Sequence, residues 1–284
     1  MQVAHRRSLR ILSVLAPIAL ASCGATATTA TSTTVAPISS TTLIPPTVTA
    51  APGTTAAPTT TVVEVTPKIT TAVFAKSSAS PNYSININYP VVSGLLSSVD
   101  ESNINSQISN AVNSWSQSFA QNLSLGSSNL QSSTSSMLNG SYKVILADGK
   151  IFSVQFVLQT STPTSPAVAT TISTLNFNLS SGTLLSLPGL FKTGSNFLSI
   201  LSRDARSQLT QQLTAQGVAA SSVNQSGTSP LPSNFAAFNI TPNSIMIGFS
   251  QGQAVPSSIG AVTVNVPLTD LAGAIDPNGP LANP

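Results

Sequence analysis

Polar and apolar residues follow two different periods along this chain, and each period predicts a different kind of element. Residues 84–89 alternate strictly, which predicts a strand with one buried face that ends at Pro90 and Gly94. Between residues 104 and 123, apolar residues recur every three or four positions, which predicts an amphipathic helix. The apolar stripe of this helix consists of Ile104, Ile108, Val112, Trp115, Phe119 and Leu123. We therefore expect Trp115 in the core, and the capping-box spacing of Ser98 and Glu101 predicts that the helix begins at Ser98.

Most of the remaining pattern consists of paired β-rich segments. Asp148-Gly149 separates residues 142–146 from 151–158, and Asp-Gly between β-rich segments is a strong hairpin signal. We expect a second hairpin at residues 169–187 and a helix at residues 195–215 that ends before Gly217. Three strands are expected next, at residues 235–240, 244–249 and 262–268, followed by a short helix at Asp270. Hairpins in series with two main helices predict an α+β fold with a largely antiparallel sheet.

The first 22 residues have the features of a bacterial lipoprotein signal peptide. Three arginines precede an apolar segment, residues 11–20, which is shorter than the about 20 residues that a membrane span needs. Leu20-Ala21-Ser22-Cys23 follows, and we expect Cys23 to receive the lipid and to become the first residue of the mature protein. The alternative is an ordinary secretory signal with a chance cysteine. The lipoprotein hypothesis predicts an exported protein that is lipid-anchored at the outer face of the cell membrane.

The sequence divides into four regions. Residues 1–22 are the signal peptide, and residues 23–80 are expected to form a disordered tether of low complexity, because Thr, Ala and Pro dominate there without apolar periodicity. Residues 81–276 are predicted to fold as one α+β domain, and residues 277–284 are predicted to be a flexible tail.

Charge and chemistry exclude several function classes. Charged residues are only 6% of the chain, and removing Arg6, Arg7 and Arg10 from the ten basic residues leaves seven to balance seven acidic ones. No net positive charge then remains to attract nucleic acid. The single histidine, His5, leaves with the signal, and acylation of Cys23 uses the single thiol. The usual general base, thiol nucleophile and imidazole ligand are then missing, so we predict no catalysis, no metal and no cofactor.

Two acidic residues keep an enzymatic alternative open. Asp204 and Asp270 are the acids of the folded region without an evident role in a turn or a helix start. As a carboxylate pair they could serve a cell-wall carbohydrate-active enzyme, either a hydrolase or a deacetylase accessory. The simpler interpretation of Asp204 is that Arg203 and Arg206 flank it on an exposed helix face.

Several segments in fixed order resemble one known family. They are residues 88–95, residues 175–179 with Ser181-Gly182 and residues 187–191, and residues 249–260. Together they are similar to the RsiV-like extracytoplasmic domain family, which includes the C-terminal domain of the RsiV anti-sigma factor, a domain beside the PdaC deacetylase and a secreted mycobacterial immunogenic antigen. The resemblance covers residues 84–271 and implies an α+β fold. Because RsiV binds lysozyme through this domain, it also implies a binding or sensing module.

The chain departs from the family at two places that would face a partner. Residues 165–168 replace a turn that resembles Gly-Gly-Ala-His, and Gly252 replaces a tyrosine. We predict that these residues and residues 250–260 form the recognition surface, with the candidate binding residues Pro166, Gly252, Gln253, Pro256 and Gly260. The expected partners are the membrane, through the lipid on Cys23, and an extracellular muramidase-like protein or a cell-wall glycan.

Overall fold

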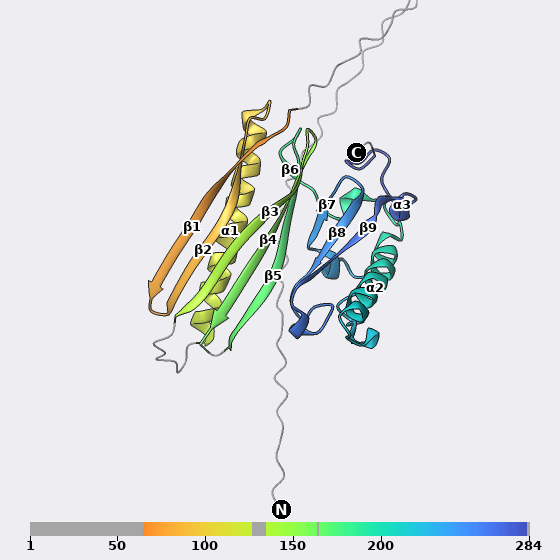
Figure 1. Cartoon of the computed structure of the whole chain (residues 1–284). Helices are drawn as coiled ribbons and strands as arrows, with labels where there is room; N and C mark the ends of the chain where they lie inside the picture. Colours follow the sequence, from red (N-terminus) through yellow and green to blue (C-terminus); the bar gives the residue numbers. More distant parts are fainter. Residues whose placement is uncertain (1–64, 127–134, 164, 283–284) are drawn as a thin grey trace, which may run out of the picture. The chain divides into compact units, whose positions relative to one another are not determined.

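The computed structural model describes residues 65–126, 135–163 and 165–282, and its fold is α+β as predicted (Figure 1). The larger sheet has the strand order β1-β2-β3-β4-β5-β6, and the smaller sheet has the order β7-β8-β9. The strands are β1 Lys68–Ala79, β2 Asn82–Ser93, β3 Ser136–Ala147, β4 Ile151–Thr162, β5 Ser165–Asn178, β6 Thr183–Leu184, β7 Phe238–Ile240, β8 Ser244–Phe249 and β9 Val262–Pro267. The α-helices of the described residues are α1 Ser98–Gly126, α2 Phe197–Ala215 and α3 Leu268–Leu271.

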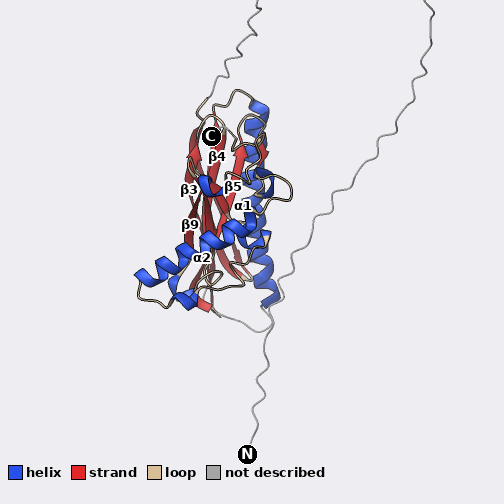
Figure 2. Ribbon diagram, turned by 90° about the vertical axis from the view of Figure 1, so that its right-hand side faces the viewer, coloured by secondary structure: helices blue, strands red, loops and turns tan. Residues whose placement is uncertain are grey.

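Strand β4 is the centre of the layered arrangement, because both of its faces are covered. Phe152, Val154 and Phe156 belong to one core cluster with Ile104 and Ile108 of α1. The alternate side chains of β4 point to the other face, where Ser153 contacts β7. Helix α1 and the small sheet therefore lie on opposite faces of the large sheet, and α2 packs on the small sheet (Figures 1 and 2). Both faces of β4 are buried over residues 151–156, and the polar side chains there, Ser153 and Gln155, bond to Asn176 and Asn239.

A buried polar cluster joins the two sheets. Asn176 of β5 donates from Nδ2 to the Phe238 carbonyl at 2.8 Å, and its Oδ1 accepts from Ser153 Oγ at 2.6 Å. Ser153 Oγ also accepts from the backbone N–H of Ile240 at 3.1 Å and from Asn239 Nδ2 at 3.0 Å. These side chains pair with the edge of β7 as a neighbouring strand would.

The pairing of β2 with β3 is parallel, whereas the other strand pairs are antiparallel. Helix α1 provides the long crossover that a parallel pair requires. The parallel pairing covers only residues 83–87 and 136–140, and Asn105 of α1 bonds to both the N–H and the C=O of Val92 beyond it. Backbone N–H groups two residues apart in a strand point the same way, and the N–H of Val92 points to Asn105 and not to β1. The missing N–H of Pro90 therefore removes no hydrogen bond between β2 and β1. The prediction that Pro90 ends the strand is therefore wrong.

The apolar stripe of α1 is confirmed, but its predicted capping box is wrong. Ser97 Oγ accepts the N–H of Asp100 at 3.2 Å, and Glu101 Oε2 accepts the N–H of Leu95 at 3.3 Å. The cap is thus one residue earlier than Ser98. Trp115 is half-buried and packs edge-on against Phe156, with ring centroids 4.9 Å apart, as expected of a core residue.

The turns that the sequence predicts most strongly have the expected geometry. Asp148 Oδ1 accepts the N–H groups of Lys150 and Ile151 at 2.8 and 2.6 Å, which closes the β3–β4 hairpin. Gly217 follows α2 with φ of 73°. Its N–H bonds to the Thr214 carbonyl and that of Val218 bonds to the Leu213 carbonyl, the pattern of a Schellman motif.

The folded region extends beyond both of its predicted boundaries, residues 81 and 276. Strand β1 lies inside residues 23–80, the predicted tether, yet it pairs with β2 over its whole length, and Ile69 and Phe74 pack against the core. At the other end, Leu281 is 4% exposed and belongs to the core cluster around α2, although residues 277–284 were expected to be a flexible tail. The predicted signal peptide, Cys23 and most of the predicted tether lie outside the described residues. Within the described ranges, none of the helices is long and apolar enough to cross a membrane.

Candidate functional site

The loop of residues 250–260, which connects β8 to β9, is held in one conformation by its own side chains. Gln253 Oε1 accepts the N–H of Ser250 at 3.1 Å, and Gln253 Nε2 donates to the Asn234 carbonyl at 3.0 Å. Asn224 Nδ2 donates to the Gln253 carbonyl at 2.9 Å. The side chain of Gln253, a candidate binding residue, therefore uses both ends of its amide to hold the loop in place.

The same loop is fastened to the edge of β5. The backbone N–H of Gln251 donates to the Thr170 carbonyl, and the N–H of Thr170 donates to Gln251 Oε1, both at 2.9 Å. The N–H of Ile172 donates to Ser250 Oγ at 3.0 Å. The loop thus pairs with β5 in place of another strand, two residues after Val168.

Glycines allow the loop of residues 250–260 to pack closely in two ways, by adopting a positive φ and by leaving room for a neighbouring segment. Gly252 and Gly260 have φ of 76° and 88°, a region that side chains with a Cβ rarely adopt. Gly227 is different, because a Cβ there would lie 1.8 Å from the Gln253 carbonyl oxygen. Gly227 is therefore needed for the approach of its own segment to the loop.

The loop presents a tip to solvent above a buried anchor. Ala254 and Val255 are buried in the core around α2, whereas Gly252 and Pro256 are exposed and Gly260 is half-buried. Val168, near the start of β5, is 50% exposed. Pro166 lies in the same strand, and its side chain is outside the described part of the chain. Gln251 bonds to Thr170, so the loop of residues 250–260 meets β5 two residues after the other predicted part of the recognition surface, residues 165–168.

Asp204 pairs with one of its two neighbouring arginines, but the predicted exposed helix face is wrong, because its side chain is only 14% exposed. Arg203 Nε donates to Asp204 Oδ1 at 2.7 Å, and this hydrogen bond, then the charge of Asp204, raises the pKa of Arg203. The charge of Asp270 adds a smaller increase to the same pKa. Arg206 points elsewhere and donates to Thr228 Oγ1 and to the Gln225 carbonyl.

The two carboxylate oxygens of Asp204 differ in their hydrogen bonds. Its side chain is 14% exposed, and among the described residues Oδ2 has no hydrogen-bond partner. The described residues contain no group of three His, Cys, Asp or Glu side chains that could hold a metal ion.

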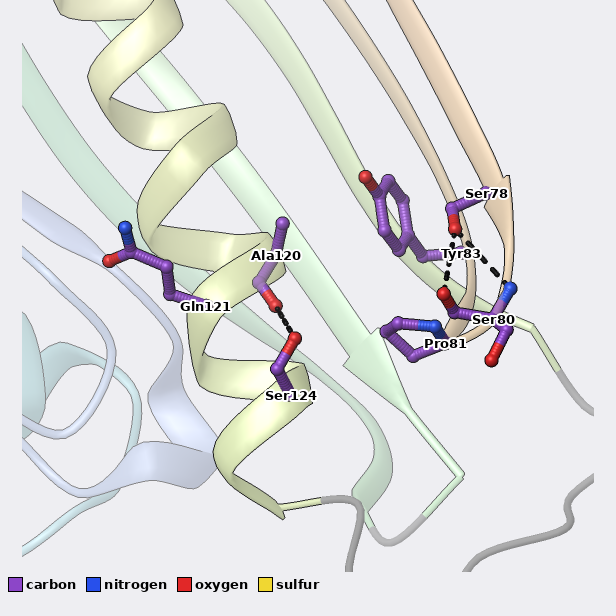
Figure 3. Close-up of a pocket in the computed structure, with 7 residues that line it drawn as sticks. All are labelled: Ser78, Ser80, Pro81, Tyr83, Ala120, Gln121 and Ser124. Atoms are coloured by element: carbon purple, nitrogen blue, oxygen red, sulfur yellow. Dashed lines mark hydrogen bonds between the residues drawn. The ribbon is translucent and has the colours of Figure 1, made fainter.

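Two open hollows lie on the α1 side of the large sheet, and sequence reasoning missed both. One of about 510 Å³ lies between the β1–β2 turn and the end of α1 (Figure 3). Its lining residues are Ser78, Ser80, Pro81, Tyr83, Ala120, Gln121 and Ser124. Tyr83 is only 6% exposed and packs on Phe119, so its ring lines the hollow but is not free to stack on a ligand. The other hollow, of about 480 Å³, lies between the first half of α1 and β6.

Comparison with known proteins finds a family match for part of this chain. Residues 189–269 match the family described as Protein of unknown function (DUF3298). No curated protein matches the chain. The fold resembles a crystal structure of a DUF3298 family member from Bacteroides fragilis NCTC 9343, with 11% identity and a TM-score of 0.52 over 74% of this chain and 94% of that one.

A DUF3298 family protein from Pseudomonas aeruginosa PAO1 is also similar, with 12% identity and a TM-score of 0.50 over 74% of this chain and 96% of that one. At such identities the likeness is one of fold. The matched segment contains α2, the small sheet and the loop of residues 250–260. The match to the DUF3298 family thus covers residues 189–269 of this chain, and the two crystal structures share its fold.

Proposed function

We propose that this protein is a surface-anchored lipoprotein whose RsiV-like domain acts as a non-catalytic binding or sensing module in the cell envelope. The observation that carries this proposal is the loop of residues 250–260, which is fixed by Gln253 and Gln251 and exposes its tip beside Val168. A loop that is already ordered before binding loses little conformational entropy when a partner arrives. Such a surface suits recognition.

The RsiV-like relation is supported by the place of its segments. Residues 187–191 and 249–260, two of the segments that carry the resemblance, fall almost wholly within the DUF3298 match at residues 189–269. A third, residues 175–179, contains Asn176, which joins the two sheets. We infer the partner class from that resemblance: a muramidase-like protein or a cell-wall glycan.

The binding proposal is tested on the exposed tip of the loop. Val168→Asp combined with Ser258→Arg changes two exposed positions of the surface, and Val73→Asp changes an exposed valine of β1 as a matched control. We expect the double variant to weaken capture of lysozyme or of peptidoglycan fragments by about tenfold, the scale of a lost interface contact, and the control to leave capture unchanged. Absence of binding to both ligands at micromolar concentration would contradict the proposal.

The lipid anchor has its own test, because it is independent of the partner. Mass spectrometry of the protein from its bacterial membrane should find a diacylglyceryl group on Cys23 as the first residue. Cys23→Ser should release the protein from the membrane fraction. An unmodified thiol at residue 23 in the native protein would remove the anchor from the proposal.

The enzymatic alternative rests on one observation, the buried Oδ2 of Asp204, which has no hydrogen-bond partner among the described residues. A substrate hydroxyl or a water could fill that position. Peptidoglycan cleavage or deacetylation by the purified protein, abolished by Asp204→Asn and by Asp270→Asn, would favour the enzyme. Equal product formation by both variants and by the unaltered protein would exclude a role for these acids.

A further inference from the structure

Three exposed apolar side chains lie near one another at the start of α1. Leu96 is 76% exposed, Val99 is 66% exposed and Leu184 of β6 is 48% exposed. Isolated apolar residues on a surface are ordinary, but a group of them marks a contact surface. We call Leu96, Val99 and Leu184 the apolar tip.

Direct contacts place the two halves of the apolar tip together. A Cβ on Gly182 would lie 2.8 Å from Asp100 Cα, so the β5–β6 turn touches the first turn of α1. Gln107 Nε2 also donates to the Gly182 carbonyl at 3.0 Å. Asn103, one helical turn after Val99, lines the 480 Å³ hollow together with Leu184.

The N-terminal part of the chain enters the domain at this same end. Lys68, the first residue of β1, pairs with Ser93, three residues before Leu96. The chain between Cys23 and β1 therefore joins the domain beside the apolar tip.

The predicted recognition surface is at the opposite end of β5. Val168 lies near the first residue of that strand, and Leu184 comes just after its last residue, Asn178. Ten residues of strand separate Val168 from Asn178, and at 3.3 Å per residue they span about 33 Å.

We propose that the apolar tip docks on the surface of the lipid bilayer, so that the loop of residues 250–260 points away from the membrane. This inference rests on the proposed anchoring through Cys23. Three side chains offer far less than the about 800 Å² per partner of a stable protein interface, so a second copy or a protein partner fits the tip poorly. A bilayer needs no such area, because the anchor keeps it at a high effective concentration next to the tip.

The charges around the apolar tip are mixed. Asp100 and Glu101 lie in the first turn of α1, whereas Lys68 pairs with Ser93, and the Lys150 carbonyl accepts the N–H of Leu179 just before the β5–β6 turn. Because neither sign of charge predominates, we expect docking on zwitterionic lipid and little dependence on salt.

The experiment uses the single cysteine as the point of attachment. The chain from residue 23 onward is coupled through the Cys23 thiol to a maleimide lipid in phosphatidylcholine vesicles, and its amide hydrogen exchange is compared with that of the uncoupled chain. We expect slower exchange at residues 95–99 and 182–185 on the vesicles and unchanged exchange at residues 250–260. The variant Leu96→Ser/Val99→Ser/Leu184→Ser should lose this protection, whereas Val73→Ser/Leu231→Ser, which alters exposed apolar residues elsewhere, should keep it.

Each other outcome rejects the inference. Equal exchange with and without vesicles rejects docking, and protection that disappears when the protein is diluted on the vesicles assigns the tip to a second copy. Circular dichroism and thermal unfolding of the triple variant confirm that it is folded. If Cys23 carries lipid in cells and the loop binds its partner while the tip shows no protection, the inference fails and the proposed function stands.

Discussion

Asn176 shows at the scale of a residue how one amide can hold two layers together. Its Oδ1 and Nδ2 bond to Ser153 and to the backbone of β7 in a position that is 1% exposed. Sequence reasoning used Asn176 only as part of a family resemblance. An asparagine between apolar residues in a strand, as in Leu175-Asn176-Phe177, is the signal that could have identified it as a buried polar link.

Replacing Asn176 by alanine should therefore be costly. The change leaves the Phe238 carbonyl and the Ser153 hydroxyl without their buried partner, and we expect a loss of about 3 kcal/mol in the free energy of unfolding. Urea unfolding measures this loss. Asn86→Ala, at an exposed position of β2, is the control and should change stability by less than about 0.5 kcal/mol. Similar losses in the two variants would show that the buried cluster has no special role.

A second prediction at the scale of a residue concerns Gly227. An alanine there would place its Cβ 1.8 Å from the Gln253 carbonyl oxygen, so one of the two segments has to move. We expect Gly227→Ala to speed hydrogen exchange in residues 250–260 and to weaken binding at that loop. Gly273→Ala is the matched control, because a Cβ at that position meets no atom within 4 Å. Unchanged exchange in the loop of Gly227→Ala would mean that this contact does not hold it.

At the scale of elements, side chains bond to the edges of several strands where a strand partner is missing. The amide of Gln208 in α2 bonds to both the N–H and the C=O of Asn265 in β9, at 2.9 and 2.7 Å. Gln212, one turn later, donates to the Thr263 carbonyl at 3.0 Å. The loop of residues 250–260 does the same for β5. Covering an edge in this way prevents pairing with another chain.

Removing both glutamines should expose the edge of β9. We expect Gln208→Ala/Gln212→Ala to lower the free energy of unfolding by about 3 kcal/mol, since three hydrogen bonds are lost at about 1 kcal/mol each, and to increase aggregation on mild heating. Calorimetry and light scattering report the two effects. Gln211→Ala, an exposed position of the same helix, should behave like the unaltered protein. If all three glutamines prove equivalent, the edge is not protected by this pair.

At the scale of the whole molecule, β1 decides where the folded region begins. Its Ser-, Thr- and Ala-rich sequence resembles the preceding tether, yet it pairs with β2 over all 12 residues. Its neighbour β2 supplies three buried residues, Tyr83, Ile85 and Ile87, to the core under α1.

A chain that begins at residue 81, the predicted boundary, should therefore be unstable. Loss of β1 uncovers the outer edge of β2 and removes the packing of Ile69 and Phe74. We expect the chain from residue 81 to unfold at a clearly lower urea concentration than the chain from residue 60, or to be insoluble. Coincident unfolding curves for the two chains would show that β1 contributes nothing to stability.

Local pattern by itself determined the main helices and most of the strands, with β1 as the exception. The apolar stripe of α1, the Asp148-Gly149 turn and the stop at Gly217 each involve residues within a few positions of one another, so the sequence contains everything that specifies them. The same pattern was sufficient to predict the α+β class. It also pointed to residues 250–260 as a separate feature between two strands.

Only the tertiary structure decided how those elements combine. The membership of β1 in the sheet, the parallel pairing of β2 with β3, the burial of Asn176 and the attachment of Gln251 to Thr170 all depend on contacts between distant segments. Gln251 and Thr170, for example, are 81 residues apart. Periodicity reports that a residue has a buried face, but not which partner covers it, because that choice is made by the packing of the whole chain.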